Sequence, residues 1–424
     1  MNLYNDMTQC NTDNSNGGGI RLVAQQYVLP FILITSLFCL WGGARAIHDV
    51  LNKHYQLILP VSKTQSALIQ AVVYMAYFLG AVPAGMLIRR MGTRVGVITG
   101  LVLFAVGSFM FMPAVSFSVF EYILAPLFVI GCGLVLLETA ANPYVTLLGD
   151  PRTSAGRLNI AQSFNGLGCV AGALLGGLFF FGGGDGGGQE AAASIAVPYT
   201  VLAVMMLVVA ACFAFIKLPE VILDDPHHRD DTADGGQRHT LGFAFFFGFA
   251  ALICYEISEI SINTFFINFM TDDGFMTPTQ ATVALSMGGL LLFMAGRVVG
   301  GLLMSRISTE RIFLVCAVGT VLMVLLAMLP LGVLSKMALI VCYVFESIMF
   351  PTIFALSIRG LGGRDTETAS SILMMSVVGG AIGPLAMGWV GDNCGMRAAL
   401  GVPLATFAVV LAYAIFVRFR RPKV

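Results

Sequence analysis

One apolar stretch, 122–148, carries side chains able to do chemistry: Glu138, Asn142 and the helix-distorting Pro143. A carboxylate at the centre of a membrane helix costs about 3 kcal/mol on insertion scales, so it normally faces a partner or a water-filled pathway. The motif recurs in the second half of the chain, where Glu346 precedes Pro351 by five positions, as Glu138 precedes Pro143. Two copies of one motif predict two copies of one helical bundle.

The first apolar stretch carries a second set of charges. Trp41, Arg45 and Asp49 are four residues apart and therefore share one helical face, with His48 beside them. Proton transport needs a carboxylate that gains and loses a proton as solvent access changes sides. Asp49 and Glu138 are the natural pair for that role. We expect Arg45 to pair with Asp49, one turn away, rather than to bind an anionic ligand.

Polar side chains also recur at helical spacing in three other apolar stretches. A binding site for a small polar molecule needs fixed hydrogen-bonding groups and an apolar surface, inside a mostly apolar cavity. The three sets are Gln70, Tyr74 and Tyr77; Asn159, Gln162 and Gly166; and Glu259, Asn263 and Phe266. Hydrogen bonding between helices is the alternative role of each set.

Three carboxylates of the second half, Glu256, Glu259 and Glu346, are expected to border the same cavity. Glu256 and Glu259 are three residues apart and can face the same side of a helix. Like charges repel in a low dielectric, so we expect at least one of the three to carry a proton at neutral pH. Glu259 is a candidate ligand-binding group, because a carboxylate forms charge-assisted hydrogen bonds with the hydroxyl groups of a ligand.

The composition places the chain in a membrane. Of its 424 residues, 57% are hydrophobic and only 11% are charged, against about 25% charged in soluble domains. The net charge is zero, which argues against nucleic acid as a partner. The nine cysteines are scattered and form no CxxC or Cys/His cluster, so we expect neither a disulfide framework nor a metal site.

Twelve apolar segments approach the bilayer-spanning length of about 20 residues. The prediction is an all-α polytopic membrane protein with two pseudo-symmetric six-helix bundles. We expect a disordered tail, the first bundle, a charged linker, the second bundle and a basic tail at 1–21, 22–218, 219–240, 241–418 and 419–424. Glycines at 172, 176, 379, 380 and 383 are predicted to be close-packing positions.

Basic residues predict the orientation. Of the 23 Lys and Arg residues, only Lys53, Lys63, Lys336 and Arg397 fall on one side of the predicted spans, and Arg45 and Arg297 lie within spans. The rest lie on the side of the two termini, so the positive-inside rule predicts that both termini are cytoplasmic.

Two six-span repeats with a substrate site between them describe the major facilitator architecture. Within it, the strings Glu138-Thr-Ala-Ala-Asn-Pro-Tyr-Val and Arg157-Leu-Asn-Ile-Ala-Gln-Ser-Phe-Asn resemble the fucose–proton symporter family, as do the residues from Leu40 to Gln56. The resemblance implies proton-driven import of a neutral monosaccharide, fucose or a related hexose, into a bacterial cell across the inner membrane. It further implies that Asp49 and Glu138 couple protons and that Glu259 contacts the sugar.

The chain departs from this pattern at Arg45, Ala46, His48 and Glu346. Because an Arg fork suits carboxylates, a transporter of a sugar acid that uses Arg45 is an alternative. An efflux transporter is a second alternative. A sugar receptor that does not transport would have no need of two titratable carboxylates. A membrane enzyme is a further alternative, but the sequence contains no HExxH or GxSxG motif. We expect no cofactor, because the proton gradient supplies the energy, and we expect the protein to be a monomer.

Overall fold

The computed structural model describes residues 23, 25–116, 120–148, 154–181, 189–215, 242–304, 306–359, 369 and 372–419. Within these ranges, twelve helices are long and apolar enough to cross a membrane, which confirms the predicted number of spans. The predicted tail at 1–21 and the linker at 219–240 lie outside the described residues, as does the predicted tail at 419–424 except for Phe419, which ends the last helix.

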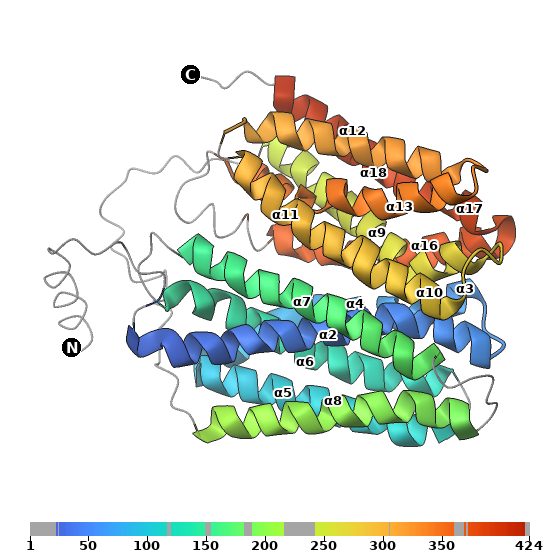
Figure 1. Cartoon of the computed structure of the whole chain (residues 1–424). Coiled ribbons are helices and arrows are strands. Elements are labelled where there is room, and N and C mark those ends of the chain that lie inside the picture. Colours follow the sequence, from blue (N-terminus) through green and yellow to red (C-terminus); the bar gives the residue numbers. More distant parts are fainter. Residues whose placement is uncertain are drawn as a thin grey trace, which may run out of the picture.

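The first half of the chain forms one group of helices (Figure 1). After a short 3-10 turn, Gln25–Tyr27, its helices are α2 (Val28–Ile58), α3 (Lys63–Ser66), α4 (Leu68–Met91), α5 (Thr93–Ser116), α6 (Glu121–Leu147), α7 (Ser154–Phe181) and α8 (Gln189–Phe215). Helix α2 packs along α7, while α6 packs on both α4 and α5 and α8 packs on α5.

The second half forms the other group (Figure 1). Its elements are α9 (Phe243–Thr271), α10 (Pro278–Val283), the π-helix η5 (Ala284–Leu290), α11 (Leu291–Met304), α12 (Thr309–Met328), α13 (Val333–Glu346), α14 (Met349–Ser357), the 3-10 turn η6 (Met375–Val378), α16 (Gly379–Cys394), α17 (Met396–Ala399) and α18 (Gly401–Phe419). Helix α9 packs on α16 and α18, and α12 on α13 and α18.

The start of α2 and the end of α18 lie at the same end of the molecule (Figure 1), which we call the termini end. At the other end, the second span of each half begins with the same local structure. Ser62 and Gln65 form a capping box before α3, and Thr277 and Gln280 form one before α10. In each, the hydroxyl accepts from the backbone N–H three residues on, and the glutamine accepts from the capping residue. These boxes repeat between the halves, like the glutamate–proline motif.

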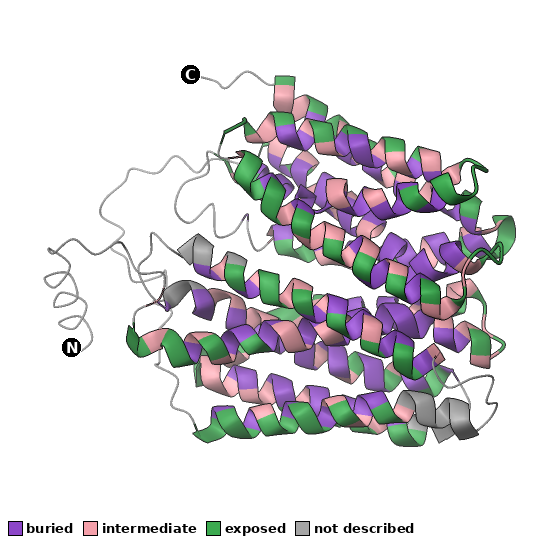
Figure 2. Ribbon diagram, viewed as in Figure 1, coloured by how far each residue is buried: buried purple, intermediate pink, exposed green. Residues whose placement is uncertain are grey.

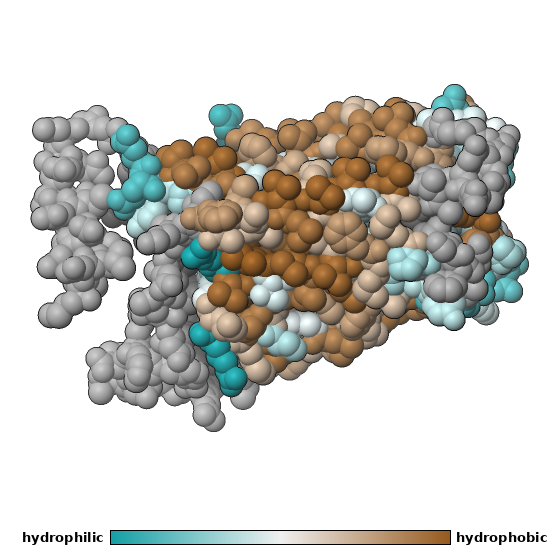
Figure 3. Space-filling model, turned by 90° about the horizontal axis from the view of Figure 1, so that it is seen from below, coloured by the Kyte–Doolittle hydropathy of each residue, from teal (hydrophilic) through white to brown (hydrophobic). Residues whose placement is uncertain are grey.

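The outward faces of the helices are apolar. Figure 2 shows exposed residues along the outer sides of α8, α11 and α12, and Figure 3 shows a hydrophobic belt with hydrophilic residues towards the ends. Leu302, Val315 and Val208 are 67%, 64% and 58% exposed. Apolar surface exposed to water has a free-energy cost, which disappears when the surface faces lipid. The chain is therefore a multi-pass membrane protein.

Glycines allow α2 and α7 to approach closely. A Cβ added to Gly168 would lie 2.0 Å from the carbonyl oxygen of Cys39, and one added to Gly172 would lie 2.2 Å from that of Gly43. Such contacts let backbones pack without side chains between them. The predicted close-packing role is confirmed for Gly172, and for 379, 380 and 383, where an added Cβ would also clash. At Gly176 it was wrong, because the nearest atom would be 3.5 Å away.

Hydrogen bonds join the two groups of helices at the end opposite the termini. The Asp392 carboxylate, in the last turn of α16, accepts hydrogen bonds from the backbone N–H groups of Lys63 and Thr64, at 2.8 and 2.9 Å, and from the Thr64 hydroxyl at 2.6 Å. A carboxylate at the N-terminus of α3 also complements its free N–H groups. We call this contact the Asp392 clasp.

A second contact at the same end is built from amides. Asn268, in α9, donates to the side-chain oxygen of Gln56, in α2. Gln56 in turn donates to Asn52 and to the Ser66 hydroxyl, each at 2.7 Å. Nearer the middle, the Ser286 hydroxyl of η5 donates to the Val170 carbonyl of α7 at 2.7 Å. These contacts hold the two groups of helices together at the opposite end.

We expect Gly168→Ala to destabilise the fold, because its methyl group would force α2 and α7 apart. Overpacking of this kind costs about 1–3 kcal/mol. Thermal unfolding in detergent should show a Tm several degrees below that of wild type. Gly301→Ala is the matched control, since no atom lies within 4 Å of its added Cβ. An unchanged Tm in Gly168→Ala would contradict the close helix packing.

We expect Asp392→Ala to loosen the opposite end, because hydrogen bonds to a charged group contribute about 1.5 kcal/mol each at exposed positions. In a cysteine-free background, spin labels at Leu57 and Leu334, which are 55% and 52% exposed, would report the separation of the two halves. The distance distribution should broaden towards longer values. The exposed Glu121→Ala is the control, and an identical distribution for Asp392→Ala and wild type would count against the clasp.

Candidate functional site

The charged face of α2 lies against α4. The Gln70 amide donates to the Asp49 carboxylate at 2.7 Å, and one turn away the Arg45 guanidinium carbon lies 5.6 Å from the ring centre of Tyr74. The two helices run in opposite directions, so successive turns of α2 meet successive turns of α4. Stacking of Arg45 on Tyr74 is a cation–π contact, which stabilises a cation in an apolar setting.

The row continues to α6 through Tyr77. Its hydroxyl donates to the Glu138 carboxylate at 2.8 Å, and its ring centre is 6.1 Å from that of Tyr74. Glu138 and Tyr77 are half-buried rather than sealed from solvent. The sequence predicted that Asp49, Arg45, Tyr74, Tyr77 and Glu138 lie in one site, and the structure brings them together. We call these five residues with Gln70 the polar row.

The second group of helices adds carboxylates to the polar row. Arg45 interacts electrostatically with Glu259, Glu256 and Glu138, and Asp49 interacts with Glu259. Tyr74 contacts Ile260 of α9 and Ala381 of α16 in a small apolar cluster between the two halves. The polar row therefore lies where the halves meet, with its cation among carboxylates from both.

Arg45 and Asp49 do not form the expected salt bridge, although the two side chains interact electrostatically. Both side chains are described, and no salt bridge within 4.0 Å joins them; Asp49 takes its hydrogen bond from Gln70 instead. Residues one turn apart on a helix are close enough to pair, but Tyr74 of α4 offers the guanidinium a stacking surface.

The Glu346 region differs from its counterpart at Glu138. Helix α6 runs unbroken through Pro143, whereas α13 ends at Glu346 and α14 begins at Met349. Pro351 has no N–H to offer the carbonyl of Ser347 four residues earlier. That carbonyl instead accepts a hydrogen bond from Nε of Arg297, at 3.2 Å. The helix break thus exposes a backbone acceptor that Arg297 satisfies.

Glu346 itself is fully buried, and within the described part of the chain neither carboxylate oxygen has a hydrogen-bond partner. Its backbone carbonyl accepts a hydrogen bond from the hydroxyl of Tyr255 at 3.2 Å. An ionised carboxylate without a partner is very costly away from water, whereas a protonated one is tolerated. Glu346 lies within electrostatic range of Glu259.

The remaining predicted residues divide between ligand and packing positions. Asn142 and Gln162 face each other, with the Gln162 amide 3.5 Å from the Asn142 oxygen, and both are half-buried. Asn263 accepts a 2.7 Å hydrogen bond from Tyr343 of a neighbouring helix. This contact matches the alternative role of Asn263, which is hydrogen bonding between helices.

Two residues of the first span have aromatic neighbours outside the polar row. Trp41 is buried and packs on Phe38, with ring centres 4.1 Å apart. His48 is buried with its ring stacked towards Tyr199 of α8, at 6.3 Å, inside the first group of helices. One residue of rotation along a helix is enough to turn His48 from the face of Asp49. Asn159 lies in α7, but its side chain is outside the described residues.

Three functional candidates escaped the sequence analysis: Tyr255, Arg297 and Tyr343. Each of the three is a single polar residue in an apolar span, and this position in the sequence could have identified it as a candidate. Among the described residues no group of three or more His, Cys, Asp or Glu side chains is arranged to hold a metal ion. The site therefore offers titratable carboxylates, hydrogen-bonding amides and hydroxyls, and aromatic surfaces.

Comparisons with known proteins agree with this chemistry. Residues 28–377 match the model of the Major Facilitator Superfamily. The chain is 33% identical over 398 residues to a glucose/galactose transporter of Brucella abortus, covering 92% of this chain and 94% of that protein. It is 31% identical over 417 residues to the L-fucose-proton symporter of Escherichia coli, covering 94% of each.

Solved structures show the same fold. A Major Facilitator Superfamily transporter, FucP, in the outward conformation superposes with a TM-score of 0.68 at 30% identity, covering 93% of this chain and 99% of that chain. The xylose transporter XylE from E. coli, in a partially occluded inward-open conformation, gives a TM-score of 0.72 at 11% identity, covering 93% and 99%. The second likeness concerns the fold alone. The chain belongs to the Major Facilitator Superfamily and is one of its membrane sugar transporters, not an enzyme.

Proposed function

We propose that this chain imports a neutral hexose or deoxyhexose, fucose or a related sugar, together with protons. The polar row carries the proposal, because it combines titratable carboxylates with sugar-binding groups at the meeting plane of the two halves. Relatives named as a fucose–proton symporter and as a glucose/galactose transporter support the substrate class. The proposed membrane is the bacterial inner membrane, and the chain acts as a monomer.

The termini end is assigned to the cytoplasm. The distribution of Lys and Arg supports this orientation. The Asp392 clasp and the Asn268–Gln56 contact then close the periplasmic end, so this state gives access from the cytoplasm. Release of these contacts opens the site to the periplasm. Alternation between the two states moves the sugar across the membrane.

Glu138 and Asp49 are assigned to the proton. Glu138 accepts a hydrogen bond from Tyr77, and Asp49 accepts one from Gln70; both donors are neutral side chains of α4. A protonated carboxyl group can keep such a bond, because its other oxygen still accepts. Neither is locked to a cation by a salt bridge in the described structure. Protonation of one carboxylate changes the balance of charge around Arg45. The second half contributes to this balance through Glu256 and Glu259. That shared balance links the proton to the relative position of the halves.

The sugar is assigned to the space bordered by Gln162, Asn142 and Glu259, with Tyr74 and Tyr77 as aromatic surfaces. Gln162 and Asn142 come from α7 and α6, and Glu259 from α9, so one ligand engages both halves. Their partial exposure leaves their polar atoms available to hydroxyl groups. Asn263 and Glu346 are assigned to the lining of the second half rather than to direct sugar contact.

A second candidate, a transporter of a sugar acid, is favoured by one observation. Arg45 makes no salt bridge in the described structure, so its guanidinium fork is free of a carboxylate partner. Against it, five carboxylates lie in the same region and would repel an anion. We therefore place the neutral sugar first.

We expect Glu138→Gln to abolish sugar accumulation driven by a pH gradient, because glutamine cannot release a proton. Exchange of internal for external sugar should persist, since the amide keeps its hydrogen bond with Tyr77. Both rates are measured with labelled fucose, galactose and glucose in proteoliposomes. The exposed Glu121→Gln should accumulate sugar normally. Gradient-driven accumulation at the wild-type level in Glu138→Gln would remove Glu138 from the mechanism.

We expect Arg45→Gln to leave the order of preference among neutral hexoses unchanged, because Arg45 faces Tyr74 and the carboxylates rather than a ligand anion. The test is competition by galactose, fucose, glucuronate and galacturonate against labelled-sugar uptake. Uronates should compete at least tenfold more weakly than the neutral sugars in both proteins. Strong uronate competition in wild type that disappears in Arg45→Gln would establish the acid-sugar alternative.

A further inference from the structure

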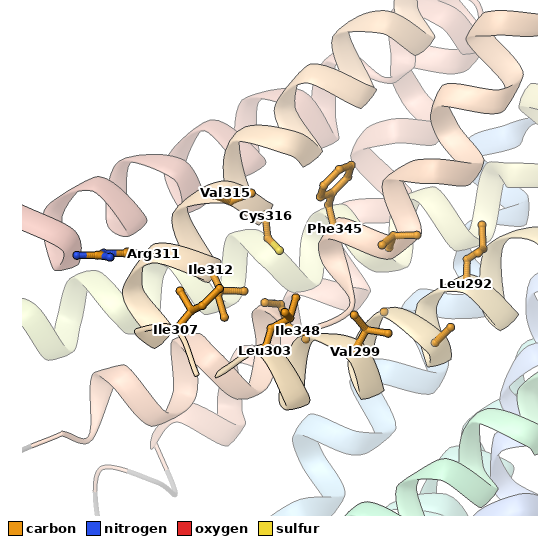
Figure 4. Close-up of a pocket in the computed structure, with 14 residues that line it drawn as sticks. Leu292, Val299, Leu303, Ile307, Arg311, Ile312, Val315, Cys316, Phe345 and Ile348 are labelled. Carbon is orange, nitrogen blue, oxygen red and sulfur yellow. The ribbon is translucent and has the colours of Figure 1, made fainter. Parts of the chain in front are cut away.

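An apolar groove opens on the outer surface of the second half, away from the polar row. It has a volume of about 440 Å³ and is lined from three helices, α11, α12 and α13. Figure 4 shows Val299 and Leu303 on one side of it and Val315 and Cys316 on the other. Val299, Leu303 and Val315 are 53%, 43% and 64% exposed, so the groove faces the surrounding lipid rather than the helix interior.

Among the described residues that line the groove, Arg311 is the one charged side chain, and it stands at one end of the set (Figure 4). Its neighbour Glu310 forms its ion pair with Arg359, so the nearest acidic side chain is already engaged. Arg306, which is exposed, lies in the connection between α11 and α12. The mouth of the groove at the termini end therefore carries an excess of positive charge.

The depth of the groove fits one leaflet of a bilayer. Its lining on α11 runs from Leu292 to Leu303, which is about 17 Å at the helical rise of about 1.5 Å per residue. Half of the hydrocarbon core is about 15 Å thick. An acyl chain entering beside Arg311 would thus end near the middle of the membrane, with its headgroup at the level of the guanidinium.

We propose that this groove is a binding site for an anionic phospholipid, whose acyl chain lies between α11, α12 and α13 and whose phosphate pairs with Arg311. An Arg fork suits a phosphate, and basic clefts between membrane helices bind acidic headgroups. The site is independent of the sugar assignment, because it shares no residue with the polar row. Since it bridges α11 to α12 and α13, its occupant stabilises the second group of helices.

The test uses the purified full chain, stripped of lipid in detergent and titrated with phosphatidylglycerol or phosphatidylcholine of identical acyl chains. Native mass spectrometry counts the bound lipid, and Tm reports its effect. Wild type should bind phosphatidylglycerol at least tenfold more tightly than phosphatidylcholine. Arg311→Gln should lose that preference, Arg311→Lys should keep most of it, and Arg90→Gln, at an exposed arginine of α4, should behave as wild type.

Filling the groove tests the acyl-chain position separately. Val315→Trp and Val299→Trp, each at an exposed position, should lower binding of both lipids and abolish the rise in Tm. Size-exclusion profiles identify a variant that fails to fold, and the other variant then decides. Equal binding of the two lipids by wild type, or wild-type phosphatidylglycerol binding in Arg311→Gln and both tryptophan variants, would overturn the proposal.

Discussion

The structure depends on holding one cation, Arg45, among carboxylates that come from both halves of the chain. A charge within the membrane is stable only if its field is balanced nearby. Here Glu138 lies on one side of the meeting plane and Glu256 and Glu259 on the other, while Tyr74 provides a stacking surface. Because the balance spans two bodies that move in a transporter, a proton on any one carboxylate alters the energy of their relative position. This shared balance is the link that we propose between proton binding and conformational change.

The contacts that close the opposite end complement this arrangement. They are hydrogen bonds at exposed or partly exposed positions, between Asp392 and the start of α3 and between Asn268 and Gln56. Such bonds contribute only about 1–1.5 kcal/mol each, because water competes for the same groups. An energy of this size suits a closure that must reopen in each cycle. By contrast, the glycine contacts within each half, as between Gly168 and Cys39, exclude solvent and keep each bundle rigid.

The sequence predicted the fold because long apolar runs are long-range signals that need no side-chain detail. It also located Asp49 and Glu138, since a carboxylate in an apolar run has few explanations. Side-chain partners were harder: Arg45 stacks on Tyr74 rather than pairing with Asp49, and His48 turns towards Tyr199. Both outcomes depend on the rotation of α2 against α4 and α8. Asp392 and Thr64 are 328 residues apart, so no local pattern indicated the clasp.

The central claim is that sugar binding beside the polar row is coupled to proton movement. The most direct measurement is the electrical current of wild-type protein in liposomes on a solid-supported membrane when a sugar is added without any ion gradient. The account predicts a transient inward positive current on addition of fucose, galactose or glucose, and none with mannitol. A sugar that enters the liposomes, or binds with clear saturation, without any current at any pH between about 5 and 8 would contradict it.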